Sequence, residues 1–155
     1  MHHSEGSTWH DAVVALLATA VALGGALAHA FEHPTKIGMT REHCFIVQRA
    51  YDGWKQLAYV LAVELAGILA VIVLYRSQRA VFWAALTALG FLVTAQVIFW
   101  VWTYPANVAT EQWTAQPANW EALRLQWEYS HLAGAAFQVL TMAALIVAVL
   151  QRTVR

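Results

Sequence analysis

Two stretches of the chain each carry a carboxylate and a histidine three residues apart. His29 and Glu32 lie at the end of the first apolar stretch, and Glu128 and His131 lie at the start of the last one. Residues three or four apart share one face of a helix, so each pair places an acid beside a base. Such pairs can perform general acid–base chemistry or ligate a metal ion. We therefore take these four residues as the candidate reacting group.

Three further polar side chains lie inside apolar stretches. Glu64 lies eight residues into its stretch from Gln56, Gln96 lies seven residues before Thr103, and Gln138 lies seven residues beyond His131. At the rise of an α-helix this places them about 10–12 Å deeper. Ionisable and polar groups at such depth usually face the interior of a bundle. The sequence therefore predicts one polar pocket, with two Glu/His pairs above a deeper polar layer.

The elements that must position these residues are four apolar stretches, each about the 20 residues that a helix needs to cross a membrane. The chain has 155 residues, of which 60% are apolar and only 12% charged, about half the charged fraction of a soluble domain. The stretches lack the alternation of a membrane β-barrel. We predict a single all-α domain, an integral membrane four-helix bundle in a lipid bilayer, with spans at 12–31, 56–75, 80–102 and 132–150.

Four spans place both chain ends and the short turn at residues 76–79 on one membrane face, which we call face A. The connections 32–55 and 103–130 then lie on the opposite face, face B. Face B carries five basic residues, which we expect in its connections: Lys36, Arg41, Arg49, Lys55 and Arg124. Face A carries four arginines directly at helix ends: Arg76, Arg79, Arg152 and Arg155. Since basic residues at span ends favour the cytoplasmic side, we expect both termini to be cytoplasmic.

The first long connection is expected to contain a short interfacial helix. Residues 41–51 place Phe45, Gln48 and Tyr51 about a turn apart. Such spacing is typical of a helix that lies at the membrane surface.

The second long connection is expected to end in a helical extension of the last span. Asn119 precedes an acidic first turn, as a helix N-cap does, so the last helix should run from near Asn119 to Gln151. The string Pro-Ala-Asn at 117–119 also occurs at 105–107. We interpret both copies as turns that lead into a helix cap.

The chemistry of the polar pocket has three interpretations. The Glu/His pairs and the lone Glu64 suit iron or manganese, as in carboxylate-bridged bundles. A metal-free pocket could instead bind a planar aromatic or quinone-type molecule, with a histidine as general base. Alternatively, the pairs cross-link the helices and satisfy one another without any ligand. The candidate metal ligands are His29, Glu32, Glu64, Glu128 and His131.

Other classes of function are disfavoured. His29 and His33 share one helix and cannot clamp a haem iron from opposite sides, which leaves His29 with His131 as the one plausible haem pair. The formal net charge of zero gives no electrostatic case for binding nucleic acid. Cys44 is the single cysteine, which excludes an intrachain disulfide.

Much of the chain matches a known pattern, in residues 28–36, 47–54, 104–107 and 113–131. These strings resemble the anthrone-oxygenase-like family of small membrane proteins, most of whose bacterial members are classed as a domain of unknown function. The resemblance implies a four-helix membrane bundle, and fungal relatives that oxidise anthrones to anthraquinones with molecular oxygen. It also implies a place in a bacterial inner membrane. The matching positions are His29, Glu32, Asn107, Trp113, Trp120, Arg124, Glu128 and His131.

Two functions of different classes follow as hypotheses. The first is a membrane oxidoreductase or oxygenase-like protein that binds a hydrophobic aromatic or quinone-type molecule near face B. The second is a non-enzymatic accessory or structural subunit, in a larger membrane complex or a homo-oligomer, whose Glu/His pairs serve helix packing. Under the first hypothesis the reacting group would be lined by Glu64, Gln96, Gln138, Asn107, Trp113 and Arg124.

Overall fold

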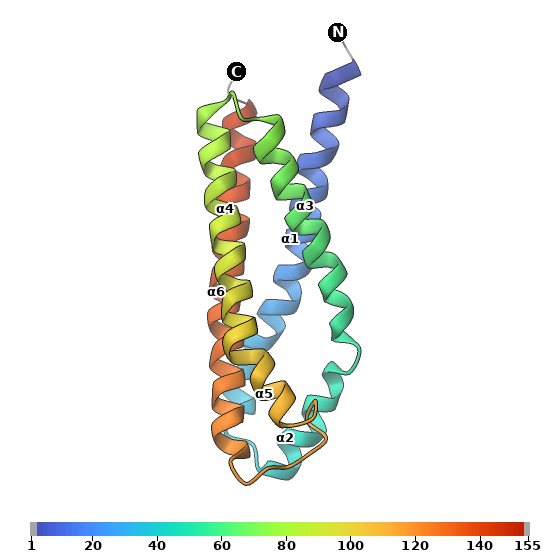
Figure 1. The fold of residues 1–155 in the computed structure, drawn as a ribbon, viewed down its shortest axis with the longest axis vertical. Helices are drawn as coiled ribbons and strands as arrows, with labels where there is room; N and C mark the ends of the chain where they lie inside the picture. The colour runs from blue at the N-terminus through green and yellow to red at the C-terminus, as the bar shows by residue number, and fades with distance from the viewer. Residues whose placement is uncertain (1–2, 154–155) are drawn as a thin grey trace.

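Long helices make up almost all of the protein (Figure 1). The computed structural model describes the backbone of residues 3–153, with side chains described for residue 10 and for 12–152, and it contains no strand in this range. The four long helices are α1 (His3–Lys36), α3 (Leu57–Leu74), α4 (Arg79–Ile98) and α6 (Trp120–Thr153). The shorter elements are α2 (Arg41–Gln48), η1 (Arg49–Tyr51), η2 (Trp54–Gln56), η3 (Phe99–Thr103) and α5 (Tyr104–Ala109).

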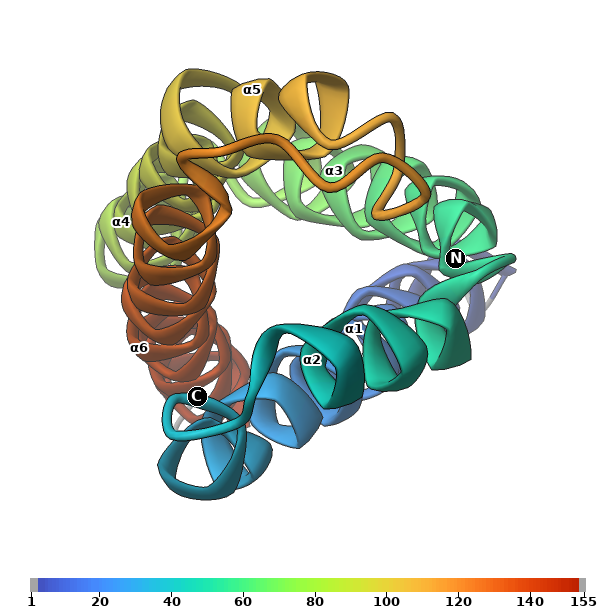
Figure 2. The same ribbon diagram turned by 90° about the horizontal axis from the view of Figure 1, so that it is seen from below.

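The helices form an antiparallel bundle with two different ends. Both chain ends and the α3–α4 turn lie at one end, and α2, α5 and the long loops lie at the other (Figure 1). Viewed along its axis, the bundle forms a ring in which α1 packs against α3 and α6, and α4 packs against the same two helices (Figure 2). The predicted all-α bundle with faces A and B is therefore confirmed. Arg155, which we had counted at face A, lies outside the described residues.

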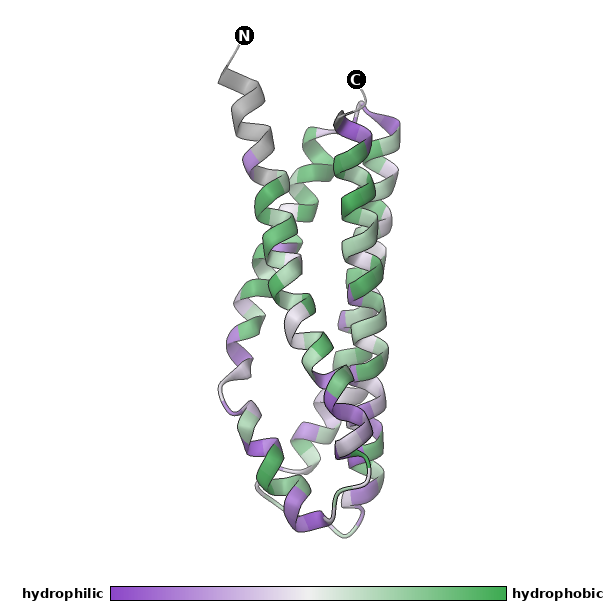
Figure 3. Ribbon diagram, turned by 180° about the vertical axis from the view of Figure 1, so that it is seen from behind, coloured by the Kyte–Doolittle hydropathy of each residue, from purple (hydrophilic) through white to green (hydrophobic). Residues whose placement is uncertain are grey.

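The outer surface of the bundle is apolar along most of its length. Figure 3 shows hydrophobic residues over the middle of the helices and hydrophilic ones gathered near the face B end. In the part of the chain described, four helical segments are long and apolar enough to cross a membrane: 12–36, 54–74, 79–109 and 120–152. In an apolar 18-residue window of each segment only 22–28% is buried inside the bundle, so much of the apolar surface is left to face lipid. The chain is an integral membrane protein.

Small side chains allow α1 and α3 to pack closely in the middle of the bundle. Ala15 on α1 is fully buried, and a Cβ atom placed on Gly67 of α3 would lie 2.9 Å from both its Cα and its Cβ. Without strong hydrophobic association in lipid, membrane helices gain contact by bringing backbones together at small residues. Gly67 therefore sets the distance between these two helices.

The first helix is longer than we predicted. The expected span ends at Phe31, where the apolar residues stop, yet α1 continues through Pro34 to Lys36. A proline inside a helix removes the hydrogen bond of its own nitrogen and crowds the preceding turn. The helix nevertheless continues, with Ile37 N donating to the His33 carbonyl at 3.0 Å. The extra turn carries Lys36 into the bundle.

The third span contains a wide π-helical turn, η3. Tyr104 N donates to the carbonyl of Phe99, five residues earlier. Gln126 on α6 donates to the Trp102 carbonyl at 2.7 Å, which satisfies an acceptor in this turn. Pro105 then lies in the first turn of α5. The predicted turn at 105–107 is therefore wrong, because proline is accepted at the start of a helix, where its missing N–H costs nothing.

The other local predictions hold. An interfacial segment is present as α2 followed by η1, and Thr40 caps it by accepting from His43 N at 3.5 Å. The second Pro-Ala-Asn string does end a loop, since α6 begins at Trp120 and Asn119 O accepts the bond from Leu123 N.

We predict that Gly67→Ala separates α1 from α3 and destabilises the bundle by about 1–3 kcal/mol, the usual cost of overpacking. The measurement is the unfolding free energy of the purified protein in mild detergent. Gly90→Ala on α4 is the matched control, because a Cβ there would meet nothing within 4 Å. Equal stabilities of the two variants would contradict the assigned role of Gly67.

Candidate functional site

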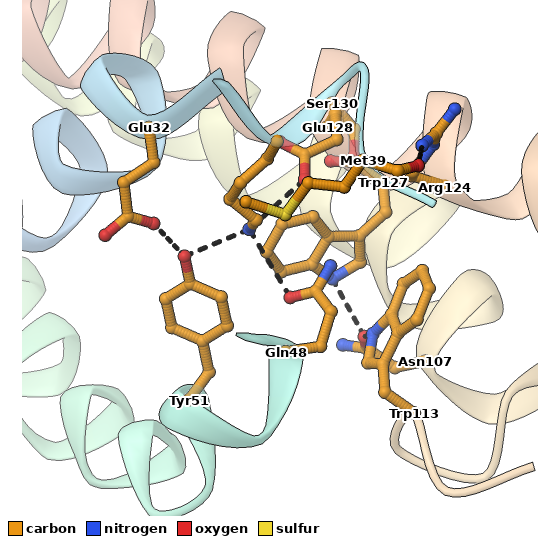
Figure 4. A network of polar contacts seen from close by, with 11 residues as sticks. Glu32, Met39, Gln48, Tyr51, Asn107, Trp113, Arg124, Trp127, Glu128 and Ser130 are labelled. Carbon is orange, nitrogen blue, oxygen red and sulfur yellow. Dashed lines mark hydrogen bonds and ion pairs between the residues drawn. The ribbon is translucent and has the colours of Figure 1, made fainter. Parts of the chain in front are cut away.

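A buried lysine lies at the centre of the polar residues near face B. The ammonium of Lys36, which is 2% exposed, lies 3.1 Å from Glu128 Oε1 on α6. It also donates hydrogen bonds to the hydroxyl of Tyr51 at 3.0 Å and to Gln48 Oε1 at 3.4 Å (Figure 4). One ammonium therefore joins the end of α1 to α2, η1 and α6.

Two aromatic rings add to the environment of this ammonium. The Lys36 Nζ atom lies 4.4 Å from the ring centres of both Tyr51 and Trp127. A cation held at this distance is attracted by the electron-rich ring, by about 2 kcal/mol where water is excluded. These contacts compensate part of the hydration that Lys36 loses.

Tyr51 connects the lysine to a second carboxylate. Its hydroxyl accepts from Lys36 and donates to Glu32 Oε2 (Figure 4). Burial, reinforced by the hydrogen bond to Glu32, raises the pKa of Tyr51 above its ordinary value. The phenol therefore keeps its proton and remains a donor, which gives a continuous chain from Glu32 through Tyr51 and Lys36 to Glu128.

The two predicted histidines stack directly on each other. The rings of His29 and His131 lie 4.1 Å apart at an interplanar angle of 28°. Tyr51, Trp54 and Trp127 surround His29 with ring centres at 4.6, 5.1 and 5.0 Å. We call these five residues the aromatic cluster. It combines flat apolar surfaces with ring nitrogens, close to two carboxylates.

Several polar atoms at this site lack a partner. His29 Nδ1, Glu128 Oε2 and Gln48 Nε2 are buried, and none has a hydrogen bond within the described part of the chain. Native proteins pair nearly all buried polar atoms, with protein groups, water or a ligand. These three atoms are therefore free to bond to water or to a polar ligand group.

Asn107 fixes the wall of the aromatic cluster. Its Oδ1 accepts from the indole nitrogens of Trp113 at 3.0 Å and of Trp127 at 2.9 Å. Trp113 follows Glu111 and Gln112, and all three have positive φ, between 49° and 64°. This conformation costs roughly 1–2 kcal/mol per residue. The hydrogen bond between Trp113 and Asn107 helps to offset that cost. Asn107 and Trp113 are thus supports for Trp127.

Arg124 is buried, and its bonds are made to the α1–α2 loop and to α6. Its Nη1 donates to the Met39 carbonyl at 2.6 Å, and its Nη2 lies 3.5 Å from Glu121. It anchors the loop between α1 and α2 onto α6. Asn107, Trp113 and Arg124, which were expected to line the ligand site, all lie at the face B end of the bundle. Each of them forms hydrogen bonds with other groups of the protein.

The predicted Glu/His pairing is wrong. In the described residues no hydrogen bond joins His29 to Glu32 or Glu128 to His131, because Glu32 is bonded to Tyr51 and Glu128 is paired with Lys36. The histidines instead contact each other across the α1–α6 interface. The prediction that His29 and His131 lie at the same depth agrees with this contact. The predicted partners of Glu32 and Glu128 were wrong.

The deeper polar layer forms only in part. Gln138 Nε2 donates to Glu64 Oε1 at 2.6 Å, which joins α6 to α3. Gln96 is half-buried and makes no hydrogen bond to either residue. Glu64 and Gln138 therefore form a pair of their own, without Gln96.

The described residues do not assemble the predicted metal site. No group of three or more His, Cys, Asp or Glu side chains is placed to share one ion in residues 10 and 12–152. The physical reason is that the three carboxylates have separate partners, Tyr51, Lys36 and Gln138. The five candidate ligands, His29, Glu32, Glu64, Glu128 and His131, do not fit iron or manganese in this arrangement.

Sequence analysis missed the lysine at the centre of the site. Lys36 had been counted as a loop charge at face B, yet it follows Glu32 by four residues and His29 by seven, the spacing of one helix face. Trp127, four residues before His131, carries the same signal. Tyr51 and Trp54 belong to short 3₁₀ turns, whose direction the sequence pattern does not reveal.

Comparisons with protein-family models, with curated proteins and with solved structures found no match to this chain. The resemblance to anthrone-oxygenase-like proteins therefore stays a hypothesis that rests on the sequence motifs.

We predict that Lys36→Met destabilises the protein by about 3–5 kcal/mol, because it leaves the buried Glu128 carboxylate unpaired. The double variant Lys36→Met/Glu128→Leu should recover most of the loss, since it removes both charges. Unfolding free energies in detergent measure both effects. Arg49→Met serves as control, since the Arg49–Asp52 pair is about half exposed and should contribute only about 0–1 kcal/mol. Additive losses in the double variant would contradict the pairing.

We predict that Cys44 resists thiol reagents in the folded protein. Its side chain is fully buried beside Phe45, Ala106 and Trp127, and burial raises the pKa of the thiol. Less thiolate forms at a given pH, so the reaction should be slow up to mildly alkaline pH and become fast on unfolding. Mass spectrometry after maleimide treatment measures it. Rapid labelling of folded protein would show that the α2 region opens.

Proposed function

We propose that the protein is a membrane oxidoreductase of the oxygenase type, which binds a planar aromatic or quinone-type molecule at the aromatic cluster. We further propose that it lies in a bacterial inner membrane, with face A cytoplasmic. The hydrophobic ligand would then reach the site from the lipid or from face B. No metal takes part in the steps below, since the donor set does not fit one.

The observation that carries the proposal is the stacked histidine pair inside an aromatic wall. A planar ring system gains area and stacking energy against such side chains, while ring oxygens need hydrogen-bond partners. Among the buried atoms that still lack partners, Gln48 Nε2 can donate to a ring oxygen, while Glu128 Oε2 can accept from a ring hydroxyl and His29 Nδ1 can exchange a proton. Mostly apolar walls with a few convergent polar groups are typical of small-molecule sites.

In the proposed reaction an activated ring methylene is oxidised to a carbonyl, with molecular oxygen as the oxidant. His29 acts as general base and removes a proton from the methylene carbon. The carbanion then reacts with oxygen. One oxygen atom becomes the new carbonyl, and the other leaves as water with both methylene hydrogens. Lys36, beside Tyr51 and Glu128, stabilises negative charge that develops on a ring oxygen.

A groove on the surface of the bundle lies beside the residues that precede His131 on α6. The groove, of about 450 Å³, lies between α4, η3 and α6 and is lined by Ile98, Trp102, Tyr129 and Ser130, among others. It does not contain the histidines. Ser130 hydrogen bonds to Thr103 at 2.7 Å and to the Trp127 carbonyl at 2.9 Å. The first bond joins α6 to η3, and the second is made to the backbone of Trp127, a residue of the aromatic cluster.

The test uses anthrone as substrate and anthraquinone as binding probe. Oxygen uptake and anthraquinone absorbance report the reaction, and quenching of tryptophan fluorescence reports binding. His29→Ala should lower the rate by about 10²–10⁴-fold, the usual effect of losing a general base, and His131→Ala should weaken binding. Circular dichroism shows that the variants remain folded.

His43→Ala is the matched control, because His43 is an exposed histidine on α2 and should keep full rate and binding. If His29→Ala and His131→Ala both match the unmodified protein, the aromatic cluster is not the site. If the unmodified protein neither binds nor oxidises these probes or related hydroxylated quinones, the proposed function is wrong.

The competing function is a non-enzymatic subunit in a larger membrane complex or a homo-oligomer. One observation favours it: the Lys36–Glu128 pair and the Glu64–Gln138 bond each join two helices, as packing devices would. It predicts that the native protein co-purifies with a partner, or with further copies of itself, and carries no chromophore. Crosslinking in membranes, followed by mass spectrometry, separates the two functions.

A further inference from the structure

Glu64 is the only ionisable residue in the middle of the four spans. Residues 12–28, 60–74, 80–103 and 132–150 contain no other Asp, Glu, His, Lys, Arg, Tyr or Cys. Its side chain is 0% exposed. Ionisable groups at membrane depth are costly, and they usually mark a functional site.

Three helices contribute to the surroundings of this carboxyl. Gln138 of α6 donates to Oε1 at 2.6 Å, and Thr19 of α1 lies close enough to interact with the same group. Thr19 is also 0% exposed. Glu64 Oε2 and Thr19 Oγ1 are both buried, and neither has a hydrogen bond within the described residues. Two buried oxygens without partners thus belong to side chains that lie close together.

A carboxylate at this position would have no counter-charge. The packed faces of α1, α4 and α6 carry no basic residue at this level. The next ionisable residue on α3 is Tyr59, five positions away and largely exposed, and on α6 it is His131, seven positions from Gln138. An isolated charge in an apolar medium is so costly that the group takes up a proton instead. A proton on Oε2 also turns it into a donor, for which Thr19 Oγ1 is a ready acceptor.

We propose that Glu64, Thr19 and Gln138 form a proton-binding site in the middle of the membrane, separate from the aromatic cluster. The ligand is a proton, held on Glu64 Oε2. The proposal does not depend on the oxidation of any ring substrate, and it stands or falls on Glu64 alone.

The surroundings of the site differ towards the two membrane faces, with polar groups on one side and a packed apolar core on the other. Towards face B, Gln138 lies two helical turns from His131 on α6, about 10 Å along the axis. Towards face A, the bundle is closed by buried apolar side chains that pack together, among them Ile68, Val71, Ala85, Ala88, Leu145 and Ala148. The proton therefore exchanges with face B, and the site stores a proton without conducting it across the membrane.

Infrared spectroscopy of the full-length protein in lipid bilayers tests the proposal directly. A protonated carboxylic acid has a carbonyl band well separated from those of carboxylates. At neutral pH the unmodified protein should show this band, and Glu64→Gln should lack it. The absence of the band in the unmodified protein, or its persistence in Glu64→Gln, overturns the proposal.

Two further sets of variants keep the result interpretable. Glu42→Gln removes an exposed carboxyl of α2 and should leave the band unchanged. Thr19→Val and Gln138→Leu keep Glu64 but each remove one neighbour, so each should shift the band. If Glu64→Gln does not fold, an unshifted band in both of these variants contradicts the assignment.

A flux measurement tests the direction of exchange. Proteoliposomes with a pH-sensitive dye inside should leak protons equally with the unmodified protein and with Glu64→Gln. A faster leak that depends on Glu64 would show a path to both faces and would overturn the closed, one-sided site.

Discussion

The face B half of the structure depends on one constraint, that the charge of Lys36 must be compensated where water is scarce. Removing an ammonium from water costs several kcal/mol, which only a close and well-hydrogen-bonded partner offsets. Glu128, Tyr51 and Gln48 supply those partners from three different elements. The end of α1, the α2–η1 segment and the start of α6 can therefore meet in only one arrangement, and this arrangement also stacks His29 on His131.

The two buried carboxyls of the bundle show two ways to place an acid in a membrane. Glu128 lies at the end of its span, where a lysine from a neighbouring helix can reach it. Glu64 lies in the middle, where the neighbours are an amide and a hydroxyl. The first arrangement holds charge and links helices, while the second suits a neutral acid. Both residues are glutamates, so their different roles follow from their depth in the bundle and from the partners available there.

The fold could be predicted from sequence because its signals are long and local. Spans of 20 apolar residues and a cap at Asn119 do not depend on distant contacts. The site was predicted only in part, since helix spacing gives the face of a residue but not its partner. Lys36, and not a histidine, is the partner of Glu128. Lys36 reaches Glu128 only because α1 continues beyond Pro34. Tyr51 and Trp54 reach the site from short turns, whose direction only the folded chain defines.

The π-helical turn η3 changes the direction in which the side chains of α5 point relative to those of α4. An α-helix rotates by about 100° per residue, and a π turn accommodates one residue more than an α turn before the helix resumes. Without that residue, α5 would continue from α4 rotated by about this angle, and Asn107 would point away from Trp113 and Trp127. In evolutionary terms, η3 behaves as a single-residue insertion whose removal would misdirect Asn107 while the membrane span stayed intact.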